Sequence, residues 1–332
     1  MTAPVTATVV TRVTRADAAA AAAAARCLEA GGLVAFPTET VYGVGADATN
    51  GQAIARLYDA KGRPAFNPLI AHVVNAAAAH ELARFGADAT RLATAFWPGP
   101  LTLVLPKTEG CPVADLATAG LDTIGVRVPS HAVAQAILEA FGKPIVAPSA
   151  NRSGHVSPTT AAHVLADLRN RIDLIVDGGA TPVGVESTIV ACLGAPILLR
   201  PGGIPREAIE RILGRRLAGP ASDAASAQAP LAPGMLASHY APRTRLRLDA
   251  REVVPGEALL AFGAAPIAGA DGAVRMLNLS PRSDLIEAAA NLFSYLRALD
   301  GADATAIAVV AIPQEGLGEA INDRLARAAA PR

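Results

Sequence analysis

The chain has 332 residues, and a single hydrophobic core rarely grows beyond about 250–300 residues, so the length favours two domains. Hydrophobic residues make up 52% of the sequence but aromatic residues only 4%, which predicts a core of Ala, Val, Leu and Ile, as in layered α/β proteins. The formal net charge is zero, which excludes a global electrostatic attraction to nucleic acid or to an anionic membrane but permits a local basic cleft.

The first predicted element is a helix over the alanine run 18–25. Such a run resembles the apolar part of a signal peptide, but charged residues flank it on both sides and alanine is a weak membrane former. Thr14 together with Asp17 resembles a capping box, and the glycines at 31 and 32 are typical of a helix stop. We therefore predict a soluble amphipathic helix and no transmembrane segment.

Apolar strands and helices alternate from there to about residue 213. Strands are predicted at 33–36, 69–74, 101–105, 123–128, 145–147, 174–176, 188–191 and 197–199. Helices are predicted at 53–60, 87–96 and 131–141, with one more before the strand at 174. Residues 38–45 and 61–68 are predicted to be polar loops.

From about residue 214 to residue 244 the composition shifts to Ala, Pro and Ser, which is typical of a linker. Beyond it, strands predicted at 246, 259–262, 274–277 and 307–312 alternate with helices at 284–299 and 319–329, the pattern of a small parallel α/β unit. The sequence is therefore predicted to form a larger α/β domain (1–213), a linker (214–244) and a small C-terminal α/β domain (245–332).

Several common catalytic motifs are absent from the sequence. It has no G-x-x-x-x-G-K-[ST] phosphate loop, no H-E-x-x-H zinc motif and no nucleophile-elbow serine. Residues 43–48 match the dinucleotide pattern G-x-G-x-x-A, but a loop separates them from the preceding strand, which argues against that function. Cys27, Cys111 and Cys192 are odd in number and widely separated, so neither a disulfide framework nor a zinc site is predicted, and a reducing cytosol is favoured.

Polar loops repeatedly follow the apolar strands. In open α/β sheets ligands bind beyond the carboxyl ends of the strands, so these loops are expected to meet in one cleft. Their side chains are mainly hydroxyl, amide and guanidinium groups. Such groups suit an anion and a polar metabolite, and they include no obvious nucleophile.

The loops also carry a series of motifs in a fixed order. They are FPTETVYG at 36–43, KGRP at 61–64, NPLI at 67–70, WPGPLT at 97–102, GVRVP at 125–129, PSAN at 148–151, ESTI at 186–189 and LRPG at 199–202. This order resembles that of the YrdC-like family. PGM at 233–235 and HYAP at 239–242 resemble the linker of its longer, two-domain members, the threonylcarbamoyl-AMP synthases. Together the motifs cover most of the chain.

The resemblance implies an open, twisted α/β catalytic domain with a concave basic surface and a small Rossmann-like C-terminal domain. The implied reaction condenses the amine of L-threonine with bicarbonate or CO2, and the carbamate then attacks the α-phosphate of ATP and releases pyrophosphate. The product, threonylcarbamoyl-AMP, would pass to a tRNA threonylcarbamoyl transferase in the cytoplasm. Mg2+ is expected to accompany ATP, held mainly by phosphate oxygens and water.

Lys61 and Arg63 lie two residues apart in a Gly-Pro loop, where both could be directed at one phosphate chain. Taken alone, they are equally well explained as a solvated basic turn. Ser149 and Asn151 have the same spacing after a strand and could supply hydroxyl and amide contacts, although both are also ordinary turn residues. By the resemblance these four act in catalysis. The implied ATP contacts are Arg63, Asn67, Thr123, Ser149, Ser157, Arg200 and Tyr240, the last from a linker that closes over the nucleotide.

Arg127 lies between two apolar residues of a predicted strand, so alternation places its side chain on the face opposite theirs. A fixed guanidinium there would suit the carboxylate of threonine. A lone histidine in an apolar strand is usually a core residue, but the resemblance places His72 beside the amino acid. The implied threonine contacts are Thr40, His72, Arg127, Ala147 and Ser187.

Two alternatives and one question stay open. An RNA-binding module could use a basic concave face, although zero net charge and few aromatic residues weaken that reading. A carbamoyl-phosphate-using maturation factor shares the domain type but carries zinc-finger regions for which this Cys-poor chain has no room. Glu39, Asp47 and Glu186 are candidate metal ligands that no pattern in the sequence supports.

Overall fold

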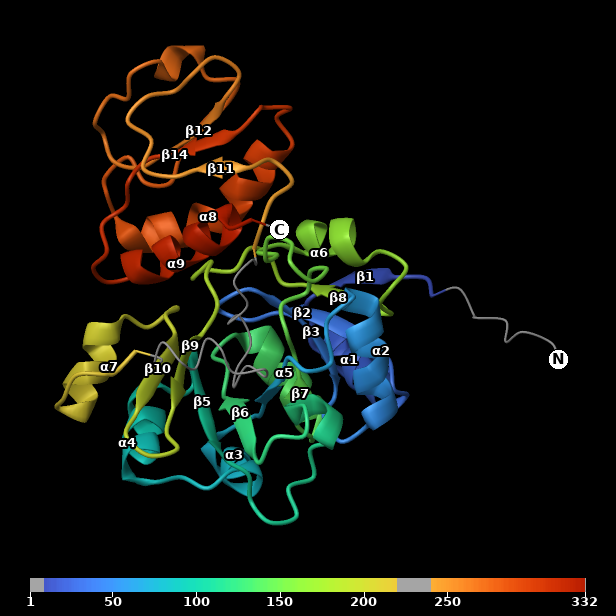
Figure 1. Cartoon of the computed structure of the whole chain (residues 1–332). Coiled ribbons are helices and arrows are strands. Elements are labelled where there is room, and N and C mark those ends of the chain that lie inside the picture. Colours follow the sequence, from blue (N-terminus) through green and yellow to red (C-terminus); the bar gives the residue numbers. More distant parts are fainter. Residues whose placement is uncertain (1–8, 220–239, 332) are drawn as a thin grey trace.

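The computed structural model describes residues 9–219 and 240–331, which form two sheets with their helices (Figure 1). The larger sheet has the strand order β1-β8-β2-β3-β7-β4-β6-β5-β9-β10. Its strands are β1 (Arg12–Arg15), β2 (Val34–Pro37), β3 (Tyr42–Asp47), β4 (Ile70–His72), β5 (Leu101–Pro106), β6 (Thr123–Arg127), β7 (Ile145–Val146), β8 (Leu174–Asp177), β9 (Thr188–Ala191) and β10 (Ile197–Arg200). The accompanying helices are α1 (Ala18–Glu29), α2 (Gly51–Lys61), α3 (Ala76–Leu82), α4 (Ala87–Phe96), α5 (Ala132–Phe141), α6 (Ala161–Leu168) and α7 (Arg206–Leu213).

The smaller sheet has the order β11-β14-β12-β13, and its paired strands are parallel. Its elements are β11 (Leu246–Arg247), β12 (Ala258–Ala261), β13 (Met276–Asn278), β14 (Ile307–Val309), α8 (Leu285–Asp300) and α9 (Gly318–Ala329). The predicted fold class, a twisted α/β domain followed by a small parallel α/β domain, is confirmed. The predicted boundaries at 213 and 245 stay a prediction; Ala218 still bridges Ile197 at the edge of β10.

The larger sheet is mixed, so, in contrast to the prediction, the loops do not all follow the carboxyl ends of parallel strands. Strand β4 runs parallel to β6 but antiparallel to β7, and β5 runs antiparallel to β6. His72 pairs in register with Arg127, and side chains of paired residues point to the same face of a sheet. The candidate site therefore lies on a face of the sheet, where carboxyl and amino ends of strands meet.

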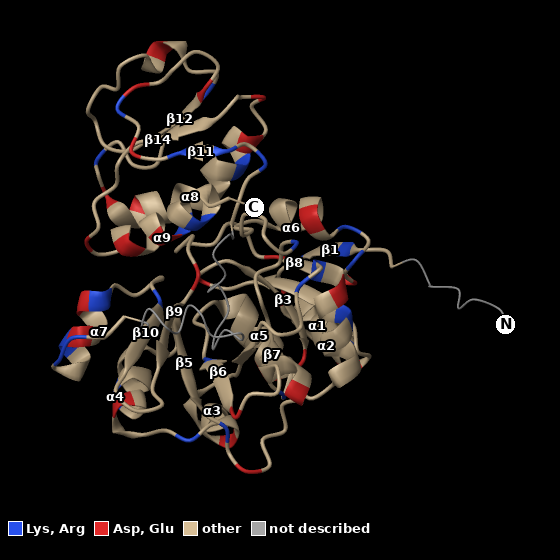
Figure 2. Ribbon diagram, in the orientation of Figure 1, with Lys and Arg blue, Asp and Glu red and all other residues tan. Residues whose placement is uncertain are grey.

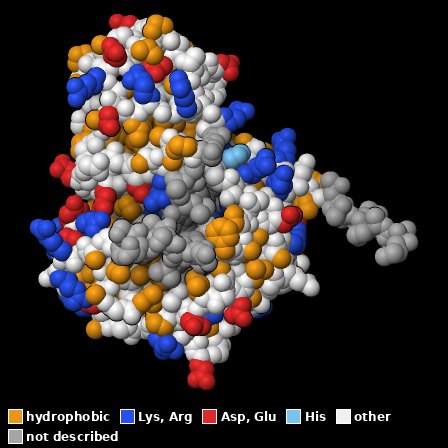
Figure 3. Space-filling view, viewed as in Figure 1, with side chains coloured by type: hydrophobic (Ala, Val, Ile, Leu, Met, Phe, Trp, Pro, Cys, Tyr) orange, Lys and Arg blue, Asp and Glu red, His pale blue; other side chains and the backbone are white. Residues whose placement is uncertain are grey.

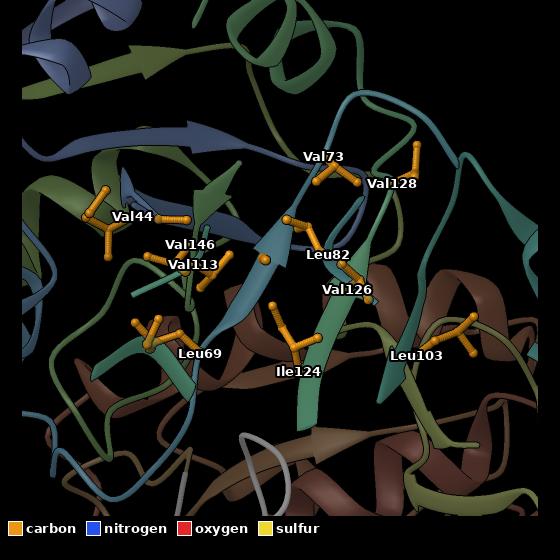
Figure 4. Packing of buried hydrophobic residues seen from close by; sticks show 14 of the residues in the cluster. Val44, Leu69, Val73, Leu82, Leu103, Val113, Ile124, Val126, Val128 and Val146 are labelled. Atoms are coloured by element: carbon orange, nitrogen blue, oxygen red, sulfur yellow. The ribbon is translucent and has the colours of Figure 1, made fainter. Parts of the chain in front are cut away.

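Hydrophobic packing leaves that face only partly covered by helices. On one side of the sheet a large core joins α2, α4 and α6 to the strands; Figure 4 shows Val44 of β3, Leu103 of β5 and Val126 of β6 within it. On the other side, α1 and α5 cover β2, β7 and β8. The same side over β4, β5, β9 and β10 carries only a small cluster of five buried residues, and the pocket adjoins it: Ile70, Val104, Ile189, Ala191 and Leu199.

Three local predictions were wrong. Thr14 lies in β1, and α1 is capped by Asp17, whose side chain accepts from the Ala20 amide at 2.7 Å. The predicted loop 38–45 includes the start of β3, in which Gly45 is required because a Cβ would lie 2.8 Å from Phe36 and from Ile145. Helices α3 and α7 were not predicted. The first two misses involve pairing or packing between distant segments, which local sequence patterns do not show.

The two domains share a core. Val41, Val156 and Val185 of the larger domain pack in one cluster with Tyr240 and with buried residues of α8 and α9. In Figure 1, α8 and α9 form the layer of the C-terminal domain that faces the larger domain. No helix within residues 9–219 and 240–331 is long and apolar enough to cross a membrane.

Candidate functional site

A pocket on the partly covered face of the large sheet gathers most of the predicted site residues. Nine of them line it: Thr40, Arg63, His72, Arg127, Ala147, Ser149, Ser187, Arg200 and Tyr240. Val41, Ile70, Pro148 and Glu186 complete the lining. The pocket thus brings together three guanidinium groups, several hydroxyl groups and one carboxylate.

Arg127 forms one wall of the pocket and is held by two neighbours. Its Nη2 donates to Glu39 Oε1 at 2.7 Å and to Thr40 Oγ1 at 3.0 Å, and the Arg127 side chain is only 5% exposed. Burial by itself would raise the pKa of Glu39, but the charge and hydrogen bond of Arg127 outweigh it and lower that pKa. Arg127 Nε is buried and has no hydrogen-bond partner among the described residues, so one donor of the guanidinium is unsatisfied.

His72 lies beside Arg127 in the sheet and is neutral at physiological pH. Burial, reinforced by the charge of Arg127, lowers the pKa of His72 to about 3. Its Nδ1 lies 3.2 Å from the Ile70 carbonyl oxygen, which can only accept, so Nδ1 carries the proton and Nε2 is an acceptor. The pocket therefore offers a neutral histidine next to a fixed cation.

Lys61 and Arg63 point in different directions, in contrast to the prediction that both reach one phosphate chain. Gly62 adopts φ +59° as the left-handed cap of α2, and the chain turns there. Arg63 lines the pocket, and it donates to the carbonyl oxygens of Asn67 at 3.2 Å and Pro68 at 3.0 Å. Burial lowers the pKa of Arg63 to about 10, so the guanidinium stays charged at neutral pH.

Lys61 is buried behind the pocket wall instead of lining it. Its Nζ donates to the carbonyl oxygens of Ser149 and Asn151, both at 2.5 Å. Burial, followed by the repulsion of Arg63, lowers the pKa of Lys61 well below its usual value. Lys61 therefore fixes the 149–151 loop, and through it the position of Ser149.

Arg200, another guanidinium of the lining, is fixed against Ser187. Arg200 donates to the Ser187 carbonyl oxygen through Nε at 3.2 Å and Nη2 at 2.9 Å, and Ser187 Oγ lies 2.8 Å from Thr102 Oγ1. Gly202 permits this approach, since a Cβ there would lie 2.4 Å from the Glu186 carbonyl oxygen. The two loops thus place a cation and a hydroxyl group side by side.

Besides Lys61, four predicted residues do not line this pocket. Thr123 lines a neighbouring hollow that shares Ile70 with it. Asn67 and Asn151 are buried, and the Oδ1 atoms of both lack a hydrogen-bond partner among the described residues. Ser157 donates to Glu186 Oε1 at 2.5 Å, so it supports the one carboxylate of the lining.

Sequence reasoning missed Arg324, a residue of α9 that reaches this carboxylate. Arg324 Nε donates to Glu186 Oε2 at 2.8 Å, and its guanidinium lies 5.1 Å from the centre of the Tyr240 ring. The available signal was its place in the buried stripe of α9, together with Ile321 and Leu325. A charged residue in such a stripe must be paired to be tolerated.

The described residues include no group of three or more His, Cys, Asp and Glu that could hold a metal ion. Of the three candidate ligands, Glu39 is paired with Arg127 and Glu186 with Arg324. The Asp47 side chain accepts from the backbone and the hydroxyl of Thr49. The residues present therefore fit a metal that arrives with its own oxygen ligands better than one held in a protein cage.

The fold and the pocket agree with the comparison of the chain with known protein families. Residues 26–202 match the family of the Sua5, YciO and YrdC proteins, described as "Telomere recombination". Residues 204–330 match the family described as "Threonylcarbamoyl-AMP synthase, C-terminal domain". The fold and these matches define a two-domain protein of the YrdC-like class.

Individual relatives narrow this class. A threonylcarbamoyl-AMP synthase of Pyrococcus abyssi is 41% identical over 92% of this chain and 92% of its own length. One of Bacillus subtilis is 40% identical over 93% of this chain and 92% of its own. The crystal structure of Pyrococcus abyssi Sua5 complexed with L-threonine is similar with a TM-score of 0.85 and 37% identity, covering 97% of this chain and 98% of that one. The chain belongs to the family of threonylcarbamoyl-AMP synthases, which are nucleotidyl-transferring enzymes.

Proposed function

We propose that the chain makes threonylcarbamoyl-AMP from L-threonine, bicarbonate or CO2 and ATP, with release of pyrophosphate. The observation that carries the proposal is the Arg127 side chain, a buried guanidinium in the pocket wall whose Nε lacks a partner among the described residues. A buried N–H of this kind is costly to leave unsatisfied, and the carboxylate of threonine would supply the acceptor.

The neighbours of Arg127 suit the rest of the amino acid. Thr40 and Ser187 line the same pocket and offer hydroxyl groups that can hydrogen-bond the threonine hydroxyl. A site built in this way rejects analogues that lack the hydroxyl group. Neutral His72 would accept a hydrogen bond without adding charge, and Ala147 leaves room for the small side chain.

Arg63 and Arg200 would hold the triphosphate across the pocket from Arg127, with Ser149 as a hydroxyl donor and Tyr240 against the nucleotide. In the proposed reaction the threonine amine attacks bicarbonate and water leaves. A carbamate oxygen then forms a bond to the α-phosphorus as the bond to pyrophosphate breaks. Such a displacement asks mainly for positioning and neutralisation of charge, which agrees with a pocket that has three arginines and no activated nucleophile.

Five further residues would support this arrangement from outside the lining. Lys61 and Asn151 would hold the 149–151 loop, Ser157 would orient Glu186, and the buried Oδ1 of Asn67 would accept a hydrogen bond close to Arg63. Thr123 would contact the nucleotide from the neighbouring hollow. Mg2+, bound to the triphosphate, would withdraw charge from it.

The relatives' printed name supports the product, and the resemblance to the family supports its use. We propose that a tRNA threonylcarbamoyl transferase in the cytoplasm consumes the product to modify adenosine in tRNA. Binding of RNA by this chain is not favoured, because its formal net charge is zero and only 4% of its residues are aromatic. On the face shown in Figure 3, Lys and Arg are interspersed with Asp and Glu.

The proposal is tested with purified chain, ATP, Mg2+, bicarbonate and L-threonine. Pyrophosphate should be released in a threonine-dependent manner, and valine, which lacks the hydroxyl group, should support much slower release in place of threonine. Pyrophosphate release at the same rate without any amino acid would overturn the proposal. Steep loss of RNA binding with salt, in the absence of threonine-dependent turnover, would instead favour the RNA-binding alternative.

A further inference from the structure

Arg324 is a cation of the C-terminal domain that is completely buried against the larger domain. It is 0% exposed and lies on α9. Besides Glu186, it donates through Nη2 to the Pro201 carbonyl oxygen at 3.0 Å and through Nη1 to Asp323 Oδ2 at 2.5 Å, and its guanidinium faces the Tyr240 ring. Figure 2 shows charged residues of both signs in this region, where α8 and α9 meet the larger domain.

Three of these contacts, Glu186, Tyr240 and Pro201, are at or next to the pocket. Glu186 and Tyr240 line it, and Glu186 precedes Ser187, the residue that fixes Arg200. Pro201 directly follows Arg200. The Arg324 guanidinium therefore contacts Glu186, the loop that contains Pro201, and the Tyr240 ring.

The contacts need an arginine and not merely a positive charge. A guanidinium presents donors in a fixed plane and can stack on an aromatic face, whereas an ammonium is a compact point charge. A lysine at this position could pair with Glu186, but it could not also hold Pro201 and cover the Tyr240 ring. Without any cation, Glu186 would be a buried carboxylate with Ser157 as a neutral donor, close enough to Arg200 to compete for it.

We propose that Arg324 is a positioning residue of the pocket, through which the C-terminal domain holds Glu186, Tyr240 and the 200–202 loop in place for ATP. The inference rests on the proposed function, because it assigns this wall to the nucleotide. It gives the C-terminal domain a direct part in the active site, since α9 completes a wall that the larger domain supplies only in part.

The test compares Arg324→Lys with Arg206→Lys. Arg206 of α7 is the control, because it also pairs across the domain interface with a residue of α9, Glu319, but Glu319 does not line the pocket, unlike Glu186. Arg324→Lys should raise the KM for ATP about 10-fold or more and lower ATP affinity in calorimetry to the same degree, while the KM for threonine changes less than about 3-fold. Arg206→Lys should change neither KM, and it should cost less thermal stability than Arg324→Lys because the Arg206 side chain is 29% exposed.

Arg324→Gln serves as a second variant and should weaken ATP binding further if it folds. An ATP affinity of Arg324→Lys within about 3-fold of the unchanged chain would overturn the inference while threonine-dependent turnover persists. A wild-type chain that binds no ATP would overturn the proposed function itself, so the two failures are distinguishable.

Discussion

At the scale of single residues, the pocket separates charge by position. Arg127 ends β6 and lies beside neutral His72 at the end of β4. Arg63 follows α2, and Arg200 is the last residue of β10. Glu39 holds Arg127 in place, but it does not accept hydrogen bonds from all of the Arg127 donors. This arrangement predicts that the two substrates depend on different arginines.

Arg127→Ala is expected to weaken threonine binding about 10–100-fold, the effect of losing charge-assisted hydrogen bonds, and to change ATP binding much less. Arg63→Ala should do the reverse. Calorimetric titration of each variant with each substrate measures the difference. Equal losses of both affinities in either variant would contradict the assignment.

His72 predicts a specific acid sensitivity of the fold. Because the pKa of His72 falls from 6.5 to about 3 on folding, the unfolded chain binds a proton between these values and the folded chain does not. The contribution of neutral His72 to the free energy of unfolding is fully present above pH 6.5 and is lost as the pH falls. The loss is about 2 kcal/mol between pH 7 and pH 5. Glu39 does not interfere, since its pKa is lowered from 4.5 and it stays ionised in this range.

When the pH falls from 7 to 5, the free energy of unfolding should therefore drop by about 2 kcal/mol less in the His72→Gln variant than in the unchanged chain. Urea unfolding at both pH values measures this difference. His80→Gln is the control, because His80 is exposed on α3. An identical pH dependence of the His72 variant and the unchanged chain would show that this histidine is not held neutral.

At the scale of elements, close approaches of backbone to backbone align the site. Gly202 lets the loop after β10 lie on residues 186–188, and Gly184 lets the loop before β9 lie on α8. At Gly184, φ is +78° and a Cβ would lie 2.2 Å from the Ala289 carbonyl oxygen, so both conformation and space demand glycine.

Gly184→Ala should destabilise the chain by about 2–4 kcal/mol, from the strained φ and the clash with α8. It should also raise the KM for ATP, since α8 packs against α9, the helix that carries Arg324. Gly194→Ala, at a position where a Cβ meets nothing within 4 Å, is the control and should change stability by less than about 0.5 kcal/mol. Thermal and urea unfolding of both variants measure the contrast, and equal stabilities would refute the close-packing argument.

At the scale of the whole molecule, the C-terminal domain is part of the core and not an appendage. The valines at 41, 156 and 185 are at most 6% exposed, and they lie in one cluster with α8 and α9. Thr159 Oγ1 lies 2.7 Å from Ser294 Oγ across the same interface. Domains joined in this way are expected to unfold together.

A chain that ends at residue 219 should therefore melt about 10 °C or more below the full chain and aggregate more readily, because it exposes this apolar surface. Scanning calorimetry should show one transition for the full chain. Two well-separated transitions, with the lower one absent from the truncated chain, would show instead that the domains are independent.

Much of this protein could be predicted from its sequence, because apolar periodicity and helix caps are local. The helix at Ala87–Phe96 was predicted to the residue, and the strands that bear His72 and Arg127 were predicted at their places. The ordered motifs also indicated the family. The linker segment 220–239, including Met235 and His239 of its motifs, lies outside the described residues, so the lid stays a prediction.

The tertiary structure alone decided which residues share the pocket. Arg127 and His72 meet because β4 and β6 pair in register, Lys61 turns away because Gly62 reverses the chain, and Arg324 arrives from α9 across 138 residues of sequence. These pairings depend on which hydrophobic faces are buried against each other. Local sequence patterns show which residues form an apolar face of a helix or strand. Which of these faces pack against each other depends on the fold of the whole chain.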